Sequence, residues 1–316
     1  MKTTSSAARV AAPLLLFLLL AAVPPAAQES AMVGPGGLTP SDVYQHGRRV
    51  MSEIELIRRA EGVSEEPRDP GTQVNKLPIH AYQKAVELMD KVGRYQDSLG
   101  LAPMEVANLP FAQLTPQVVF DAVDAVLENL REIKAELGIE EEIDEPPFEE
   151  GKTPTDVYEL LWRASYMLDG LTEAIQPSDV YARQQQAVND LLTVSEELDT
   201  DLSTSAERFS DKTPKDVLME NYVNMYRLAR VQRTLGMDPF HVPPLPGGEI
   251  TPSNVYDTAG TLIGELHRIK RHLEITDPTP PLVNVDGKTP NDVYGLAKML
   301  QAGLAETLDA AEAADL

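Results

Sequence analysis

Apolar residues recur along much of this chain in alternating steps of four and three positions. Two uninterrupted examples are Val119, Val123, Val126, Leu130, Ile133 and Leu137, and Val255, Ala259, Leu262, Leu266, Ile269 and Leu273. This spacing is the heptad seam of helices that pack nearly parallel or antiparallel in left-handed bundles. Each such segment therefore predicts one amphipathic helix of about 23 residues, roughly 34 Å long. No segment shows the alternation of a strand, so the predicted fold class is all-α.

A proline marks the start of every predicted helix. The prolines open variants of Thr-Pro-x-Asp-Val-Tyr and lie at Pro40, Pro78, Pro116, Pro154, Pro177, Pro214, Pro252 and Pro290. Threonine is a good helix cap, proline suits the first helical position, and a carboxylate in the first turn complements the helix dipole. The motif thus predicts eight helices, although Leu77 and Gln176 replace the capping threonine in two copies.

The spacing of the prolines predicts the domain organisation. Successive intervals are 38, 38, 38, 23, 37, 38 and 38 residues, which indicates a repeat of one helix plus an extended linker. The short interval lies between Pro154 and Pro177, where we expect the fourth helix to turn sharply into the fifth near Ile175. A shift of 136 residues superposes the two halves. The prediction is two duplicated four-helix bundle units, at residues 38–176 and 177–316.

The linkers leave the helix direction open. Linker residues match between the halves, with Leu99, Pro103 and Leu109 falling on Leu235, Pro239 and Leu245. Such matches favour extended segments docked on helices over loose spacers. An extended linker is long enough to return along a whole helix, so the helices of one unit could all point the same way. An up-and-down arrangement with long loops is the competing topology.

The first residues predict export. A basic start, an apolar run over residues 11–23 and small residues at Ala26 and Ala27 are typical of a signal peptide, here assigned to residues 1–27. The run is too short to span a bilayer, which takes roughly 20 apolar residues. Residues 28–37 are expected to be a flexible N-terminus. The mature protein is predicted to be soluble, periplasmic or secreted, with no integral membrane segment after signal removal.

Charge and cysteine content narrow the choice of partners. The formal net charge is −23 at pH 7, and so acidic a surface repels phosphate backbones. Nucleic acid is therefore not an expected partner. The chain has no cysteine, so disulfides do not support the fold and apolar burial must do so.

The best candidate for a site is the aromatic residue four positions after each motif proline. These residues are Tyr44, Tyr82, Phe120, Tyr158, Tyr181, Tyr256 and Tyr294, and Leu218 takes the place in the sixth copy. If the helices share one direction, each group of four would ring one end of a bundle, where tyrosines suit a small ligand. The other interpretation is end packing against neighbouring linkers. We favour packing, because the feature recurs in nearly every repeat.

Metal, haem and catalytic motifs are not found in the sequence. The five histidines are scattered and we expect them at the surface, without a metal or a cofactor. An acidic run from Glu140 to Glu150 could hold a divalent cation, but a solvated linker explains it better. No nucleophile elbow, Walker loop or dinucleotide fingerprint occurs, so no catalytic residue is assigned. We expect Trp162 and the methionines to lie in the core.

Three functions remain open from the sequence. The leading hypothesis is a non-enzymatic binding or scaffolding module whose partner, a protein or a small molecule, is unknown. The second is a small-molecule-binding or sensory four-helix domain with a pocket inside the bundle, which predicts differences at inward positions such as Gly47 and Gln184. The weakest is an acid/base enzyme that uses buried carboxylates.

Overall fold

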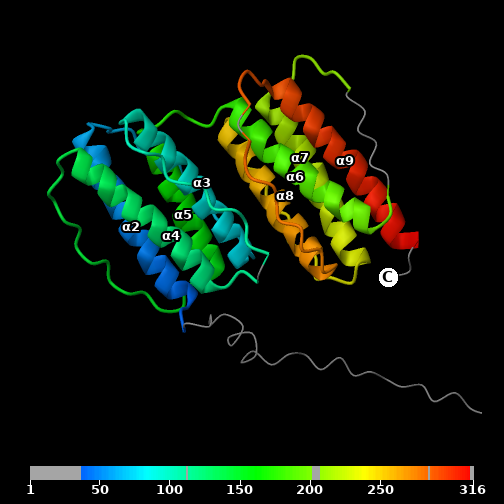
Figure 1. Ribbon diagram of the computed structural model, residues 1–316, viewed down its shortest axis with the longest axis horizontal. Coiled ribbons are helices and arrows are strands. Elements are labelled where there is room, and N and C mark those ends of the chain that lie inside the picture. The colour runs from blue at the N-terminus through cyan, green and yellow to red at the C-terminus, as the bar shows by residue number, and fades with distance from the viewer. Residues whose placement is uncertain (1–36, 112, 201–206, 284, 314–316) are drawn as a thin grey trace, which may run out of the picture.

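The computed structural model describes residues 37–111, 113–200, 207–283 and 285–313, and within these it is all-helical, with eight α-helices and no strand (Figure 1). The predicted signal peptide at residues 1–27, and the flexible N-terminus apart from Gly37, lie outside the described residues. The helices are α2 Pro40–Ala60, α3 Pro78–Ser98, α4 Pro116–Glu136, α5 Pro154–Leu168, α6 Pro177–Glu197, α7 Pro214–Thr234, α8 Pro252–His272 and α9 Pro290–Ala313.

Each helix begins at its motif proline because the local chemistry satisfies the first turn. In α2, the backbone N–H of Thr39 donates to the carboxylate of Asp42 at 2.7 Å, and the Thr39 hydroxyl donates to it at 2.6 Å. In α3, His80 replaces this carboxylate, and its Nδ1 accepts from the backbone N–H of Leu77 at 2.9 Å. The prediction of eight helix starts is confirmed.

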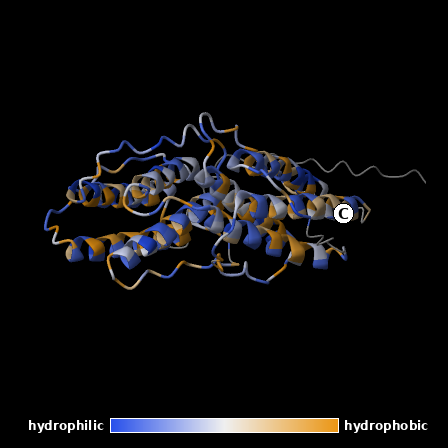
Figure 2. Ribbon diagram, turned by 90° about the horizontal axis from the view of Figure 1, so that it is seen from above, coloured by the Kyte–Doolittle hydropathy of each residue, from blue (hydrophilic) through white to orange (hydrophobic). Residues whose placement is uncertain are grey.

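The helices pack in two sets of four, which we call the first group (α2–α5) and the second group (α6–α9). In the first group α2 and α3 each contact both α4 and α5, so α2 and α3 lie diagonally opposite. The second group repeats this pattern, with α6 and α7 each contacting α8 and α9. The helices carry hydrophobic and hydrophilic residues on different faces (Figure 2), and the heptad positions, including Val123, Leu130 and Ile133, are buried.

All four helices of a group start at the same end. Pro40, Pro78, Pro116 and Pro154 line one small space together, each with the residue three positions further on. The four motif prolines of the second group surround an equivalent space. Both groups therefore have the co-directional arrangement, and every connection within a group runs back along its length.

The returning linkers dock on the helices. Leu109, Leu114 and Ile275 are buried, and the Tyr82 hydroxyl donates to the backbone carbonyl of Asn108 at 2.9 Å. Gln186 donates to the carbonyl of Pro280 at 2.6 Å in the other group. The polar backbone of an extended segment must be satisfied when it is covered, and these side chains supply part of that.

The connection between the groups differs from the expectation. The fourth helix does not continue to Ile175 but ends at Leu168, after 15 residues. Eight residues then lead to Pro177, of which Ile175 is buried. The short interval is thus accommodated by a shorter helix followed by a brief connector.

The groups meet through α3 and α8, the one pair of helices with substantial contact between them in the described part of the chain. These helices run antiparallel. Ile79, at the start of α3, lies near Gly264, whereas Gln83 lies near Gly260, closer to the start of α8. A side chain at Gly264 would place its Cβ 3.3 Å from Cγ1 of Ile79, so glycine permits the close approach.

Within the described residues, no helix is both long and apolar enough to cross a membrane.

Candidate functional site

The four motif aromatics of one group do not ring a shared cavity, although Tyr158 and Tyr256, which belong to different groups, both line the small cavity where α3 meets α8. The end of each group is lined instead by the motif prolines and the residues three positions after them, and the space between these holds about 10 Å³, the size of one water. The aromatic residues lie on the flanks and each packs against a different neighbour.

Four of the tyrosines are covered by lysines. Each lysine lies two residues before a motif proline, and its Nζ is 4.2 to 4.4 Å from the ring centroid: Lys152 over Tyr44, Lys76 over Tyr158, Lys288 over Tyr181 and Lys212 over Tyr294. The backbone N–H of each of these lysines also donates to a side-chain oxygen one position after the neighbouring proline, namely on Ser41, Thr155, Ser178 or Asn291. These paired contacts hold together the starts of neighbouring helices, α5 with α2 and α3 with α5 in the first group, and α9 with α6 and α7 with α9 in the second.

The other motif aromatics have individual environments. Phe120 stacks on His46, with ring centroids 4.3 Å apart. Tyr82 is bonded to the linker as described above. Tyr256 is buried, its ring is 5.4 Å from the Arg183 guanidinium, and its hydroxyl has no hydrogen-bond partner among the described residues.

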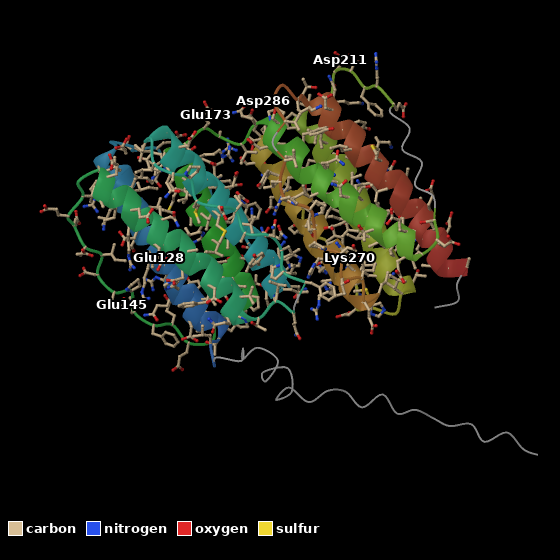
Figure 3. All side chains as sticks on the ribbon, in the orientation of Figure 1. Glu128, Glu145, Glu173, Asp211, Lys270 and Asp286 are labelled. Carbon is tan, nitrogen blue, oxygen red and sulfur yellow. The ribbon has the colours of Figure 1, made fainter. Side chains whose placement is uncertain are left out.

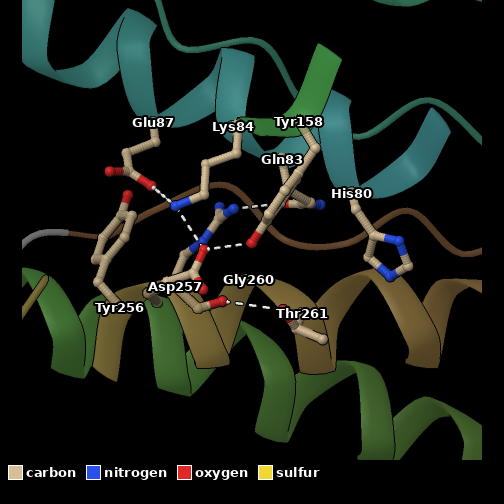
Figure 4. A pocket seen from close by; sticks show the side chains of 10 residues that line it. His80, Gln83, Lys84, Glu87, Tyr158, Tyr256, Asp257, Gly260 and Thr261 are labelled. Carbon is tan, nitrogen blue, oxygen red and sulfur yellow. Dashed lines mark hydrogen bonds and ion pairs between the residues drawn. The ribbon is translucent and has the colours of Figure 1, made fainter. Parts of the chain in front are cut away.

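A buried charged network lies where α3 meets α8 (Figure 4). The Lys84 ammonium donates to Glu87 at 2.8 Å and lies 2.5 Å from Oδ1 of Asp257. Tyr158 of α5 donates its hydroxyl proton to the same Asp257 oxygen at 2.8 Å. Because Asp257 belongs to α8, one carboxylate joins a lysine and a tyrosine of the first group to the second group.

His80 and Glu265 form a second polar link across this interface. His80 Nε2 lies 2.7 Å from Oε1 of Glu265, and both side chains are almost fully buried. Since His80 Nδ1 accepts from a backbone N–H, the histidine is neutral with its proton on Nε2. Burial lowers the pKa of His80, although the Glu265 carboxylate opposes that effect.

The electrostatics of the network favour fixed charges over proton transfer. Burial would raise the pKa of Glu87, but the ammonium groups of Lys84 and Lys91 outweigh it and lower that pKa to about 2. Burial would lower the pKa of Lys84, but Asp257 and Glu87 raise it. The cavity inside the network holds about 10 Å³, enough for one water and not for a substrate.

Other buried carboxylates are paired as well. Glu53 lies 2.7 Å from the Lys134 ammonium, and Asp190 lies 2.7 Å from that of Lys270, which is labelled in Figure 3. Their placement matches that of structural ion pairs, in which each charge is offset by its partner.

Two larger clefts lie between the groups, and neither is inside a four-helix group. The smaller, of about 340 Å³, is bounded by α3, α6, α8 and two linkers, and Asp90 lies at its edge. Burial raises the pKa of Asp90, against the effect of Arg94, whose guanidinium is 2.5 Å away.

The larger cleft, of about 900 Å³, lies between the helix starts of the first group and the end of α8. Its lining combines apolar residues such as Phe240 with the basic residues Lys76, Arg268 and Arg271. His267 also lines it, is 4 % exposed, and has an Nε2 without a hydrogen-bond partner among the described residues. This cleft has the size and polarity to admit a small organic anion.

The outer face of α7 is the most apolar exposed helix surface in the described part of the chain. Met219, Val223 and Tyr226 are 44 %, 40 % and 61 % exposed. Their spacing of four and three places them on one side of the helix. Lys215 and Arg230 flank them, and we call these five residues the α7 face.

The expectation of surface histidines is wrong for three of the five. His46, His80 and His267 are 4 %, 3 % and 4 % exposed. His46 pairs with Asp124 at 2.8 Å, and His80 with Glu265. A histidine can be buried at low cost when it is neutral and hydrogen-bonded, and the partners here are too distant in sequence for a local pattern to reveal.

The acidic linker is exposed and pairs with arginines of α2. Glu141, Glu145 (Figure 3) and Glu149 lie 3.2, 2.5 and 2.6 Å from Arg59, Arg49 and Arg48, respectively. In the described part of the chain, no group of three or more acidic, histidine or cysteine side chains is arranged to hold a metal ion. Trp162 is buried, as predicted, but the expectation that the methionines lie in the core is wrong for Met219, which is 44 % exposed.

No protein-family model, curated protein or solved structure matches this chain.

Proposed function

We propose that this chain is an exported, non-enzymatic helical-repeat protein that acts as a binding or scaffolding module, either in the periplasm or as a secreted protein. It consists of two copies of one four-helix unit joined through α3 and α8. The α7 face carries the proposal, because an exposed apolar helix side with basic flanks is typical of an interaction surface.

Matching hydrogen bonds support the duplication. Gln96 in the first group accepts from a backbone N–H eight residues further on and donates to Asn129 at 2.8 Å. Gln232 in the second group accepts in the same way and donates to Glu265 at 2.6 Å. Each member of the second set lies 136 residues after its counterpart.

Matching ion pairs also support the duplication. Glu53 with Lys134 and Asp190 with Lys270 occupy corresponding places on the first and third helices of each group. The acidic side chain is a glutamate in the first group and the shorter aspartate in the second, yet both carboxylates lie 2.7 Å from the lysine ammonium. A single ancestral unit accounts for both sets of contacts more simply than independent origin.

Binding through the α7 face is testable by cross-linking. A photoreactive residue at Val223 should capture a macromolecule in the native extracytoplasmic fraction, whereas one at Glu55, exposed on α2, should not. Equal labelling at both positions, or none at Val223, would contradict a binding role for this face.

Export is testable separately. The full chain should be recovered outside the cytoplasm and begin near residue 28. A chain lacking residues 1–27 should remain in the cytoplasm. Recovery of the uncleaved chain in the cytoplasm would refute the localisation and leave the binding proposal untouched.

Small-molecule binding is the second candidate, and the larger cleft favours it. Buried His267 presents there a nitrogen without a partner among the described residues, and Arg271 supplies a positive charge, so a small carboxylate or phosphate is the expected class of ligand. Native mass spectrometry of protein from its own host should show a bound anion that Arg271→Met abolishes. Arg59→Met, at the corresponding place on α2, is the control.

A further inference from the structure

The two faces that join the groups have open counterparts at the other sides of the molecule. α3 is the second helix of the first group and docks on α8, the third helix of the second group. Their counterparts are α7 and α4. No contact between α7 and α4 exists within the described chain, so one copy of each docking face is unused.

The counterpart of the buried α3 surface is the α7 face. Gln83 and Glu87, which are buried against α8, correspond to Met219 and Val223. Arg94, which reaches α6 of the second group, corresponds to Arg230. Where α3 is polar and covered, α7 is apolar and exposed, which is the composition of an interface whose partner is missing.

The counterpart of the α8 surface is the outer side of α4. We define the α4 face as Asp121, Asp124, Ala125, Glu128 and Glu132, which are all exposed or half-buried. Four of these five are acidic. The α7 face has the basic residues Lys215 and Arg230, so the two faces have complementary charge.

The register of the internal interface can be transferred to the open faces. Ile79 beside Gly264 becomes Lys215 beside Glu128, which is a contact of opposite charges. The ion pair of Arg94 with Asp179, 3.1 Å long, becomes Arg230 with Asp42.

The centre of the transferred contact is apolar on one side. In the internal interface Gln83 lies beside Gly260. The corresponding residues are Met219 on the α7 face, which is apolar, and Asp124 on the α4 face, which Ala125 follows in sequence.

The two helices of the transferred interface are expected to lie further apart than α3 and α8 do. Gly260 and Gly264, which let α8 approach α3, are replaced by Asp124 and Glu128. Larger acidic side chains hold the helices further apart and leave the charges partly hydrated. Such a contact is weaker and more sensitive to salt than the buried one.

We propose that a second copy of this chain docks its α4 face on the α7 face, so that copies associate head to tail. This inference rests on the proposed binding function and names the partner of the same surface. Because the joined faces are not equivalent, each copy retains one free face of each kind. Such a contact joins copies into a ring or an open chain and does not produce a dimer with two equivalent faces.

A charge-swap experiment tests the register. Lys215→Glu and Glu128→Lys each place like charges in contact, and both positions are exposed, so the fold should tolerate them. Sedimentation velocity of the purified full chain should show self-association that rises with concentration and falls at high salt. Either single variant should weaken it by about tenfold or more.

Sedimentation of a mixture of the two variants is the decisive measurement for the proposed register. In an equimolar mixture every Glu at position 215 can meet a Lys at position 128, and the native pair is also present, so association should return to the wild-type level. Arg163→Glu, at an exposed position of α5, which among the described helices contacts neither α4 nor α7, is the control and should leave association unchanged.

The outcomes separate the two proposals. A wild-type chain that stays monomeric, or association that the swaps do not affect, overturns the head-to-tail contact. If Val223 then cross-links to a different macromolecule, the binding function stands and only the identity of the partner fails. If Val223 cross-links to nothing, the α7 face does not bind a macromolecule and both proposals fail.

Discussion

His80 Nε2 lies 2.7 Å from Oε1 of Glu265, so a neutral histidine at the start of α3 donates to a carboxylate near the end of α8. The corresponding residue of the first group is Asn129, which is neutral and whose hydrogen bonds in the described part of the chain stay within its own group. A charged carboxylate therefore stands at this position in the group where the residue bonds across the interface, and a neutral amide stands at the corresponding position of the other group.

Replacing this carboxylate by an amide should weaken the interface. In Glu265→Gln, the new amide NH₂ group competes with donors from His80, Gln232 and Arg268, so one buried donor loses its acceptor. We expect a loss of about 1–3 kcal/mol in the free energy of unfolding, measured by urea denaturation. Glu55→Gln, at an exposed position of α2 outside both faces, should change it by less than about 0.5 kcal/mol.

Stability should fall on mild acidification because of buried histidines. Burial, together with Lys270 and Arg271, lowers the pKa of His267 to about 4 from an ordinary value of 6.5. The unfolded chain therefore takes up a proton before the folded chain does, and stability present above pH 6.5 is lost as pH falls towards 4. His267→Gln should reduce the slope of unfolding free energy against pH in this window. His272→Gln, at an exposed position, should preserve it.

A side chain at Gly264 should separate the two groups. Glutamate stands at the corresponding position of α4, and Gly264→Glu would place it against Ile79 in a buried contact. We expect destabilisation of more than about 2 kcal/mol, since a buried charge would lack a partner. The reverse change, Glu128→Gly on an exposed helix side, should cost about 1 kcal/mol from helix propensity. Equal costs in urea denaturation would show that the glycine is not needed for close packing.

The motif tyrosines should act through their rings and not their hydroxyls where a lysine covers them. Tyr181→Phe keeps the surface under Lys288 and should change the free energy of unfolding by less than about 0.5 kcal/mol. Tyr181→Ala removes both packing and the cation–π contact and should cost about 1–2 kcal/mol. Self-association should be the same in both variants. A change in binding with unaltered stability would instead support a ligand site at the helix starts.

The sequence predicted the helices well because their start signals are local. In α2, Asp42 accepts hydrogen bonds from the backbone N–H and hydroxyl of Thr39, and Pro40 has no N–H that needs an acceptor, whatever surrounds them. The heptad pattern likewise identifies the buried side of a helix. It does not reveal helix direction, since parallel and antiparallel neighbours bury the same positions.

The charged interface could not be predicted because its partners are distant. His80 and Glu265 are 185 positions apart, and neither occupies one of the heptad positions that predict burial. In the sequence, His80 takes the place of the motif carboxylate. That substitution was the one available signal, and its meaning depended on which helix would cover it.

The shared direction of the helices also has a consequence for how the protein folds. Among the described helices, the first helix of each group does not contact the second and packs on the third and fourth. It can therefore pack only on residues that lie far along the chain. Short hairpins of adjacent antiparallel helices, which speed the folding of ordinary bundles, are not available here. Folding slows as contacts become more distant in sequence. This protein therefore combines the secondary structure of a fast-folding chain with the contact order of a slower one.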